Sequence, residues 1–236
     1  MSDNGDGISG LEFYLLPNGT YGVKAGTTKY MEKIVIPSTH NGKSVTVIME
    51  NGFESMRNLK EIIMPESLTT IEDYAFNDCK ALIKADIPSS VVSIGAYAFN
   101  NCSNLQEIAL PKNITTIKEY SFYGCSSVSN KIIIPDSVSI IEPHALEISS
   151  EKEIYFEKES SWNVTSDKAY YQQNSYLYTS ENNYYTDFNG PKIFTVSVDS
   201  TTNYAEDFFY KRLSFSVRNV GTARFLATNE CTWTKK

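Results

Sequence analysis

From Leu59 to Ala81 the sequence reads LKEIIMPESLTTIEDYAFNDCKA, and the stretches that begin at Leu82 and Leu105 read LIKADIPSSVVSIGAYAFNNCSN and LQEIALPKNITTIKEYSFYGCSS. Proline, isoleucine, phenylalanine and cysteine recur in them at a constant step of 23 residues. A fixed period of about 20 to 50 residues indicates stacked structural units and takes precedence over any local interpretation. The sequence therefore predicts a repeat protein.

The repeat continues on both sides of these three units. A fourth unit begins at Val128 and carries one extra residue, and an earlier unit opens at Ile36-Pro37 with an insertion around His40. Residues 153–156 have the pattern of the first strand of a sixth unit.

Each unit has a simple physical interpretation. Ile62 and Met64 alternate with their neighbours, which predicts a short strand, and the proline that follows cannot donate to a ladder. Leu68 and Ile71 return to the core, and Phe76 fills it from a turn or half-helix. Because one unit cannot bury its own apolar side, the units must stack, with parallel strands about 4.8 Å apart. The predicted fold class is a repeat solenoid.

The pattern L-x-x-I-x-I-P-x-S-V-x-x-I-x-x-x-A-F-x-x-C resembles the BspA-type leucine-rich repeat. The stretch from Gly19 to Lys24, followed by Ile34–Ser38 and Asn41–Lys43, is also similar to the opening of such proteins. The resemblance implies a solenoid that is secreted or displayed on the cell surface, where it adheres to host matrix proteins, glycans or other cells. It supplies no catalytic residues.

Three regions are expected along the chain. Residues 1–29 form an N-terminal cap, because two alternating runs flank Asn18-Gly19, a strong hairpin signal. Residues 30–160 hold the repeats. Residues 161–236 contain both tryptophans and half of the 16 tyrosines, and the alternation in 192–198 and 213–217 predicts strands. This last region is a β-rich cap or a small appended β domain.

Composition excludes several classes of protein. The 236 residues are 41% hydrophobic, enough for a sizeable core, and the formal charge of −7 disfavours nucleic acid as a partner. No run of about 18 apolar residues exists, so we expect no membrane insertion. The start is polar and acidic, unlike a signal peptide, so either the protein stays inside the cell or a signal has been removed. We expect a monomer.

The cysteines at the shared repeat position are Cys79, Cys102 and Cys125. Stacked at about 5 Å, they could accept one disulfide but could not surround a tetrahedral zinc. We expect them to be reduced and buried, as small hydrophobic side chains.

No catalytic, metal or cofactor site is expected. The two histidines, His40 and His144, lie in an insertion turn and at a repeat position, and neither accompanies a nucleophile motif. Phosphate-binding and dinucleotide-binding glycine motifs do not occur. We therefore expect a protein that is not an enzyme and needs no cofactor.

The outward side of the predicted strands is the first candidate binding surface. One column of residues alternates in charge and the next is mostly apolar, which suits a protein or glycan ligand; the alternative is that both columns only stabilise the sheet. The charged column comprises Lys33, Glu61, Lys84, Glu107, Lys131 and Glu153, and the second comprises Val35, Ile63, Asp86, Ala109, Ile133 and Tyr155.

A tyrosine-rich stretch is the second candidate surface. Its rings could stack on sugars or lie in an interface, although packing within a cap also explains them. The residues are Tyr170, Tyr176, Tyr178, Tyr184 and Tyr185. The sequence thus leads to two hypotheses: an adhesion module that binds through the strand side of the solenoid, and a structural spacer or display stalk that binds nothing.

Overall fold

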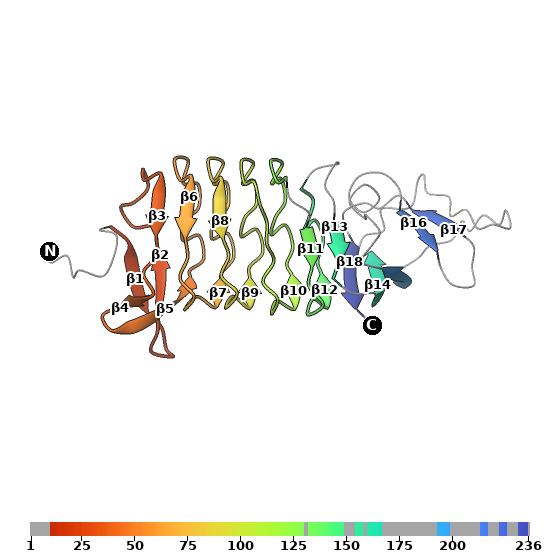
Figure 1. The fold of residues 1–236 in the computed structure, drawn as a ribbon, viewed down its shortest axis with the longest axis horizontal. Coiled ribbons are helices and arrows are strands. Elements are labelled where there is room, and N and C mark those ends of the chain that lie inside the picture. Colours follow the sequence, from red (N-terminus) through yellow and green to blue (C-terminus); the bar gives the residue numbers. More distant parts are fainter. Residues whose placement is uncertain are drawn as a thin grey trace.

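The computed structural model describes residues 10–129, 132–148, 154–157, 160–166, 193–198, 213–216, 222–225 and 231–235. Within these residues the chain forms strands and turns and no helix. Successive turns of the chain follow one another along a single axis, with the N-terminal strands at one end (Figure 1). The predicted solenoid is confirmed, and it is a β-solenoid whose repeats are about 24 residues long.

Two lines of short strands run along the solenoid. The sequence predicted one strand in each repeat, and most repeats have two. The first line contains β3 (Lys33–Val35), β6 (Glu61–Ile63), β8 (Lys84–Asp86), β11 (Ile132–Ile134) and β13 (Ile154–Phe156). The second contains β5 (Lys43–Ile48), β7 (Thr70–Ile71), β9 (Ser93–Ile94), β10 (Thr116–Ile117) and β12 (Ile140–Ile141). Neighbouring strands within each line are parallel wherever they pair.

The register places equivalent repeat positions beside each other. Ile34 faces Ile62 between β3 and β6, and Ile62 faces Ala85 between β6 and β8. A strand was also expected around Ile108, but that segment is not strand. Ile108 is nevertheless buried between exposed neighbours, so its side chain keeps the alternation of the other repeats.

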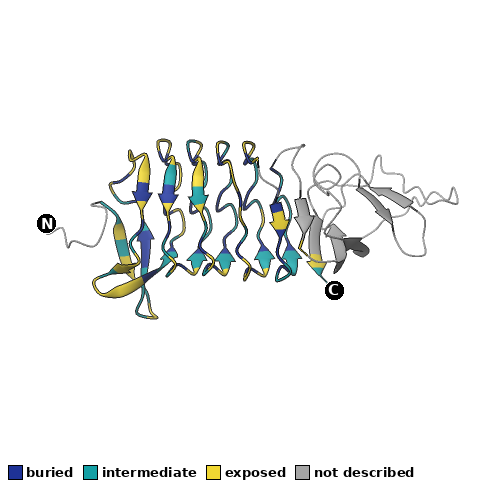
Figure 2. Cartoon of the chain, in the orientation of Figure 1, coloured by how far each residue is buried: buried dark blue, intermediate teal, exposed yellow. Residues whose placement is uncertain are grey.

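Stacked phenylalanines occupy the centre of the solenoid. Phe76 is fully buried, and its ring centroid lies 5.4 Å from that of Phe53 and 5.1 Å from that of Phe99, which in turn lies 5.4 Å from Phe122. Figure 2 shows buried and exposed segments alternating along the coloured turns of the solenoid. The core is therefore one continuous column to which each repeat adds one layer.

The three repeat cysteines are free thiols and are fully buried beside this column. The Sγ of Cys102 donates to the carbonyl of Phe76, one turn earlier, at 3.2 Å, and Cys79 and Cys125 repeat the contact with Phe53 and Phe99. Burial raises the pKa of the Cys79 and Cys125 thiols to about 12. These cysteines are thus inert core residues at neutral pH.

Hairpins form the N-terminal end. β1 (Glu12–Leu15) and β2 (Tyr21–Lys24) are antiparallel about Asn18-Gly19, which confirms the predicted hairpin, and β2 continues in parallel onto β5. The insertion forms a second hairpin, β4 (Thr39–His40) with β5. His40 is half-buried there, and its ring stacks on Phe13 at 4.0 Å. The two hairpins therefore pack on each other.

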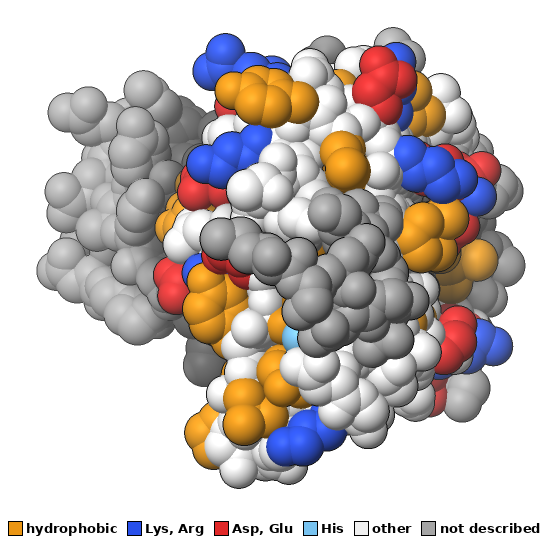
Figure 3. Space-filling view, turned by 90° about the vertical axis from the view of Figure 1, so that its left-hand side faces the viewer, with side chains coloured by type: hydrophobic (Ala, Val, Ile, Leu, Met, Phe, Trp, Pro, Cys, Tyr) orange, Lys and Arg blue, Asp and Glu red, His pale blue; other side chains and the backbone are white. Residues whose placement is uncertain are grey.

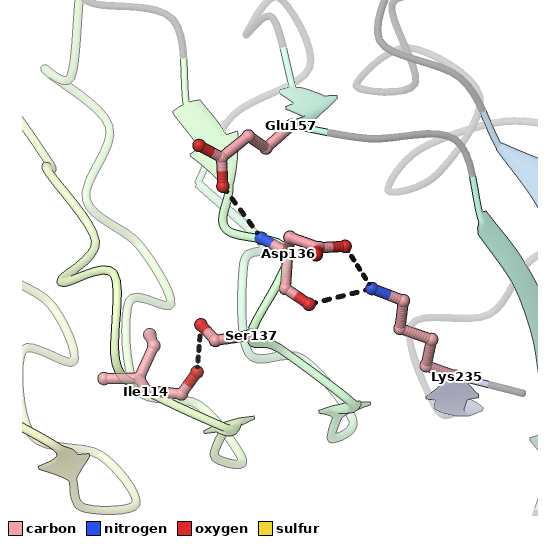
Figure 4. Close-up of polar contacts among 5 residues, drawn as sticks. All are labelled: Ile114, Asp136, Ser137, Glu157 and Lys235. Carbon is pink, nitrogen blue, oxygen red and sulfur yellow. Dashed lines mark hydrogen bonds and ion pairs between the residues drawn. The ribbon is translucent and has the colours of Figure 1, made fainter.

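Further strands follow the repeats: β14 (Ser160–Ser166), β15 (Ile193–Val198), β16 (Leu213–Ser216), β17 (Thr222–Phe225) and β18 (Cys231–Lys235). β18 lies between β12 and β14 and is antiparallel to both. The Nζ of Lys235 lies 2.6 Å from Oδ1 of Asp136 and 2.8 Å from its carbonyl oxygen (Figure 4). A C-terminal strand thus pairs directly with the last complete repeat.

Candidate functional site

The strand face is the outward side of the first strand line. In β3 the central Ile34 is buried while Lys33 and Val35 are exposed, because successive side chains of a strand point to opposite sides. The same alternation leaves 39% of Ile63 and 54% of Ile133 exposed. Apolar side chains therefore reach solvent at several positions along this side.

The residues of the charged column lie in the predicted register, but only some of the predicted ion pairs between strands form. Lys33 faces Glu61, which faces Lys84. Lys33 and Glu61 form an ion pair of 2.9 Å, as the alternation of charge predicts. Lys84 differs: its Nζ lies 3.0 Å from Oδ2 of Asp86, on the same strand. Residues two apart in a strand share a side of the sheet, so Asp86 competes with Glu61 for this lysine.

These acidic neighbours act on the ammonium group of Lys84. The hydrogen bond and charge of Asp86 raise the pKa of Lys84, and the carboxylates of Glu61 and Glu107 add to the effect. The lysine is therefore held in its charged form at the centre of the strand face. Because its positive charge is balanced by nearby carboxylates, the face has no strong field of one sign.

The predicted site residues divide into those the structure places and those it does not. Glu107 and Ala109 are exposed on the strand face beside the segment of Ile108. Tyr155 lies in β13, opposite Ile133, where only the backbone is described. Outside the described residues lie Lys131, Glu153, Tyr170, Tyr176, Tyr178, Tyr184 and Tyr185. The tyrosine-rich surface therefore stays a prediction.

A column of stacked aromatic rings is a surface feature that the sequence analysis missed. Tyr74, Tyr97, Tyr120 and His144 follow one another with ring centroids 4.8, 4.7 and 4.4 Å apart. The constant 23-residue step between the three tyrosines was the sequence signal for this ladder. Neighbouring rings occupy the internal ring faces, so these faces are not open to a ligand.

Carboxylates gather beside the second strand line, around a shallow depression lined by residues such as Glu50, Glu72, Asp73 and Lys118. They already have backbone partners: Glu72 accepts a hydrogen bond from the amide of Glu50 at 2.7 Å, and Asp73 accepts one from Ala96 at 2.9 Å. Among the described residues, no group of three or more His, Cys, Asp or Glu side chains could hold a metal ion. The hydrogen bonds of Glu72 and Asp73 therefore connect adjacent turns of the solenoid.

The repeats match a known family. Six copies of the BspA-type leucine-rich repeat region cover residues 26–153, and the chain belongs to this family. No curated protein has a sequence that matches the chain. In the part of the chain that the structure describes, none of the segments is an apolar helix of membrane-spanning length.

A solved leucine-rich repeat structure shares the fold. A leucine-rich repeat protein of T. pallidum is 24% identical, with a TM-score of 0.55, over 59% of this chain and 66% of that one. A leucine-rich cell surface protein of Faecalibacterium prausnitzii is 21% identical, with a TM-score of 0.40, over 65% of this chain and 55% of that one. The chain spans less than two thirds of the length of both proteins.

Proposed function

We propose that the protein is a non-enzymatic adhesion module at the cell surface that binds a host or neighbouring-cell protein or glycan through its strand face. The observation that carries this proposal is the exposure of Val35, Ile63 and Ile133 on the outward side of the first strand line, where Val35 and Ile63 share one sheet and Ile133 lies in the next. Apolar side chains repeated beside charged ones offer both buried area and orientation to a partner. Membership of the BspA-type family supports the surface location.

The charges of this face favour a protein or a glycan over a nucleic acid. Lys33 and Lys84 are each within 3.0 Å of a carboxylate, and the whole chain carries a formal charge of −7. A phosphate polymer needs unpaired basic side chains, whose binding releases counterions. An array of glycans and matrix proteins is therefore the appropriate first screen.

A structural spacer or display stalk is the second candidate function. The ion pairs Lys33–Glu61 and Lys84–Asp86 support it, because side chains that satisfy each other leave little for a ligand to complement. Asp86 also interrupts the apolar column between Ile63 and Ala109. A parent protein that captures nothing from the array would favour this function.

Reversing the chemistry of the strand face tests the proposal directly. The double variant Lys84→Glu with Ile63→Asp places carboxylates at the centre of the face and interrupts its apolar residues. We expect it to lose capture of the array ligand that the parent binds, while it still unfolds cooperatively. If it binds as strongly as the parent, the strand face is not the binding site.

The matched control changes another part of the surface. Lys80→Glu with Val92→Asp also breaks an ion pair of 3.0 Å, that of Lys80 with Asp78, and also replaces an exposed apolar residue, since Val92 is 50% exposed. Neither residue belongs to the strand face. Ligand capture should therefore survive in this variant. Its loss would show that such a pair of acidic substitutions abolishes capture wherever it lies on the surface.

We further propose that residues 161–236 serve as the C-terminal cap of the solenoid. The antiparallel pairing of β18 with β12 supports this role, because an antiparallel strand ends the parallel series of repeats. The ion pair of Lys235 with Asp136 fastens the same strand. Residues 1–160 without this segment should therefore be less soluble or should self-associate, which light scattering measures.

A further inference from the structure

One sheet of the solenoid begins with a strand whose outer edge has no strand partner among the described residues. β3 is the first strand of the order β3-β6-β8 and pairs only with β6. The N-terminal hairpin does not extend this sheet, because β2 pairs with β5 in the other line. Figure 1 shows β3 at the N-terminal end of its line, with β1 and β2 alongside β5.

The hydrogen bonds of β3 fix which backbone groups point toward that edge. The carbonyl of Glu32 accepts from the amide of Glu61 at 3.1 Å, and the amide of Ile36 donates to the carbonyl of Ile63 at 2.9 Å. Alternate residues of a strand bond to the same neighbour. The N–H and C=O groups of Lys33 and Val35 therefore point away from β6, toward the unpaired edge.

Side chains at this edge define the strand that would fit. Among the described residues, the carboxylate that pairs with Lys33 is that of Glu61, which lies on the β6 side of the strand. Val35 is 40% exposed, and Tyr30 is 84% exposed just before the strand. Figure 3 looks onto this end, where basic, acidic and hydrophobic side chains lie close together around the rim. Ile34 is fully buried, so there is little room for a second large inward side chain beside it.

We propose that the edge of β3 is a docking site for an extended peptide strand of a partner protein, which adds in parallel to the sheet. The strand carries an acidic residue opposite Lys33, a small residue opposite Ile34 and an apolar residue opposite Val35. The acidic position continues the alternation of charge from Glu61 through Lys33. The backbone of the peptide continues the ladder that β3 and β6 already form, which is how exposed edges capture strands.

Peptide titration of the labelled, full-length protein tests this site. The probe is acetyl-Ser-Thr-Glu-Ala-Val-Thr-Ser-amide, and the control peptide has Lys in place of Glu. We expect the probe to shift the backbone amide resonances of Lys33 and Val35 and to leave those of Lys84 and Asp86 unchanged. The control peptide should bind at least fivefold more weakly, with a difference that shrinks as salt is added.

Two substitutions at one position separate backbone capture from general apolar contact. Val35→Pro removes the outward N–H and keeps every hydrogen bond to β6, because that amide does not face β6. Val35→Ala removes the apolar side chain and keeps the N–H. We expect Val35→Pro to abolish the shifts at Lys33 and Val35→Ala only to weaken them.

The outcomes are distinct from those of the strand-face test. The double variant Lys84→Glu with Ile63→Asp should bind the peptide as the parent does, even if it loses the array ligand. Resonance shifts at β8 rather than β3, equal binding of both peptides, or binding that persists in Val35→Pro would overturn the proposal. So would a second copy of the chain occupying this edge, seen as a concentration-dependent dimer that Val35→Pro dissociates.

Discussion

The rings of Tyr74 and Tyr97 stack 4.8 Å apart at an angle of 11°, although the backbone of both residues is left-handed, with φ of 58° and 56°. Tyr120 and His144 share this conformation at the equivalent positions. A left-handed conformation costs a bulky residue roughly 1–2 kcal/mol, whereas asparagine and glycine adopt it more readily. The first repeat has Asn51 at this position, with φ of 55°. In each later turn, the favourable energy of ring stacking therefore offsets the cost of the left-handed backbone.

The balance between stacking and strain predicts the effect of Tyr97→Asn. The substitution relieves strain but removes contacts with Tyr74 and Tyr120, each worth about 0.5–1.5 kcal/mol beyond area burial. We expect a net loss of about 1 kcal/mol in the free energy of unfolding, measured by urea denaturation. Tyr97→Phe keeps the ring and should change stability little. A more stable Asn variant would show that strain dominates.

Phe99→Ala should cost about 3–5 kcal/mol of stability, because it leaves a cavity between two buried rings. Phe53 stacks on one phenylalanine and Phe99 on two. Phe53→Ala should therefore cost less than Phe99→Ala. Thermal unfolding followed by circular dichroism compares the two, and equal losses would contradict a core built of stacked layers.

The buried thiols make stability fall at alkaline pH. The pKa of Cys79 and Cys125 is about 12 in the folded protein, above the ordinary value of 9.0. The folded state therefore keeps protons that the unfolded state loses, and the free energy of unfolding should decrease as pH rises from about 9 toward 12. Urea denaturation across this range measures the slope.

Two controls accompany the alkaline prediction. Cys125→Ala removes one titrating group, so its stability should fall less steeply with pH than that of the parent. At neutral pH a thiol reagent should label the native protein slowly and reach all four cysteines only after denaturation. Rapid labelling of three or four thiols in the native protein would contradict the burial of the repeat cysteines.

Lys84→Glu alone should leave the fold intact. It places a third carboxylate beside Glu61 and Asp86, and like charges on adjacent strands repel. Because the lysine is exposed and the core is untouched, we expect a small decrease in melting temperature that nearly disappears in 1 M salt. A large decrease that salt does not relieve would indicate that Lys84 has a role in packing.

Lys235→Met should loosen the C-terminal strand. The substitution removes hydrogen bonds to the carboxylate and the carbonyl of Asp136, and bonds to charged groups are each worth about 1.5–3 kcal/mol. We expect faster hydrogen exchange at Trp233 and Thr234 with little change at Phe76. Uniform acceleration along the whole chain would mean that the strand and the repeats unfold together.

The repeat period allowed the solenoid and its core to be predicted. Phe76 and its equivalents and the cysteine column follow from the 23-residue step, because stacking places equivalent positions side by side. The outward position of Lys33, Ile63 and Lys84 follows from the alternation within each short strand. The Asn18-Gly19 hairpin follows from local turn chemistry. These features depend on contacts between adjacent turns or adjacent residues.

Features that neither the repeat period nor the spacing of residues encodes could not be predicted from the sequence. The second strand line has only two residues in most repeats, such as Thr70-Ile71, too few for alternation to show. The choice of Lys84 between Asp86 and Glu61 depends on distances that sequence spacing does not give. The pairing of β18 with β12 joins residues far apart in the chain, for which the repeat pattern carries no signal.

The position of β18 leads us to expect that the repeats and the C-terminal strand fold in separate steps. Adjacent repeats meet after about 23 residues, whereas Lys235 contacts Asp136 across 99 residues. Closing the longer loop costs about 1 kcal/mol more in chain entropy, since this cost grows with the logarithm of loop length. The repeats can therefore assemble layer by layer from any starting point, and we expect the closing strand to join in a later, slower step.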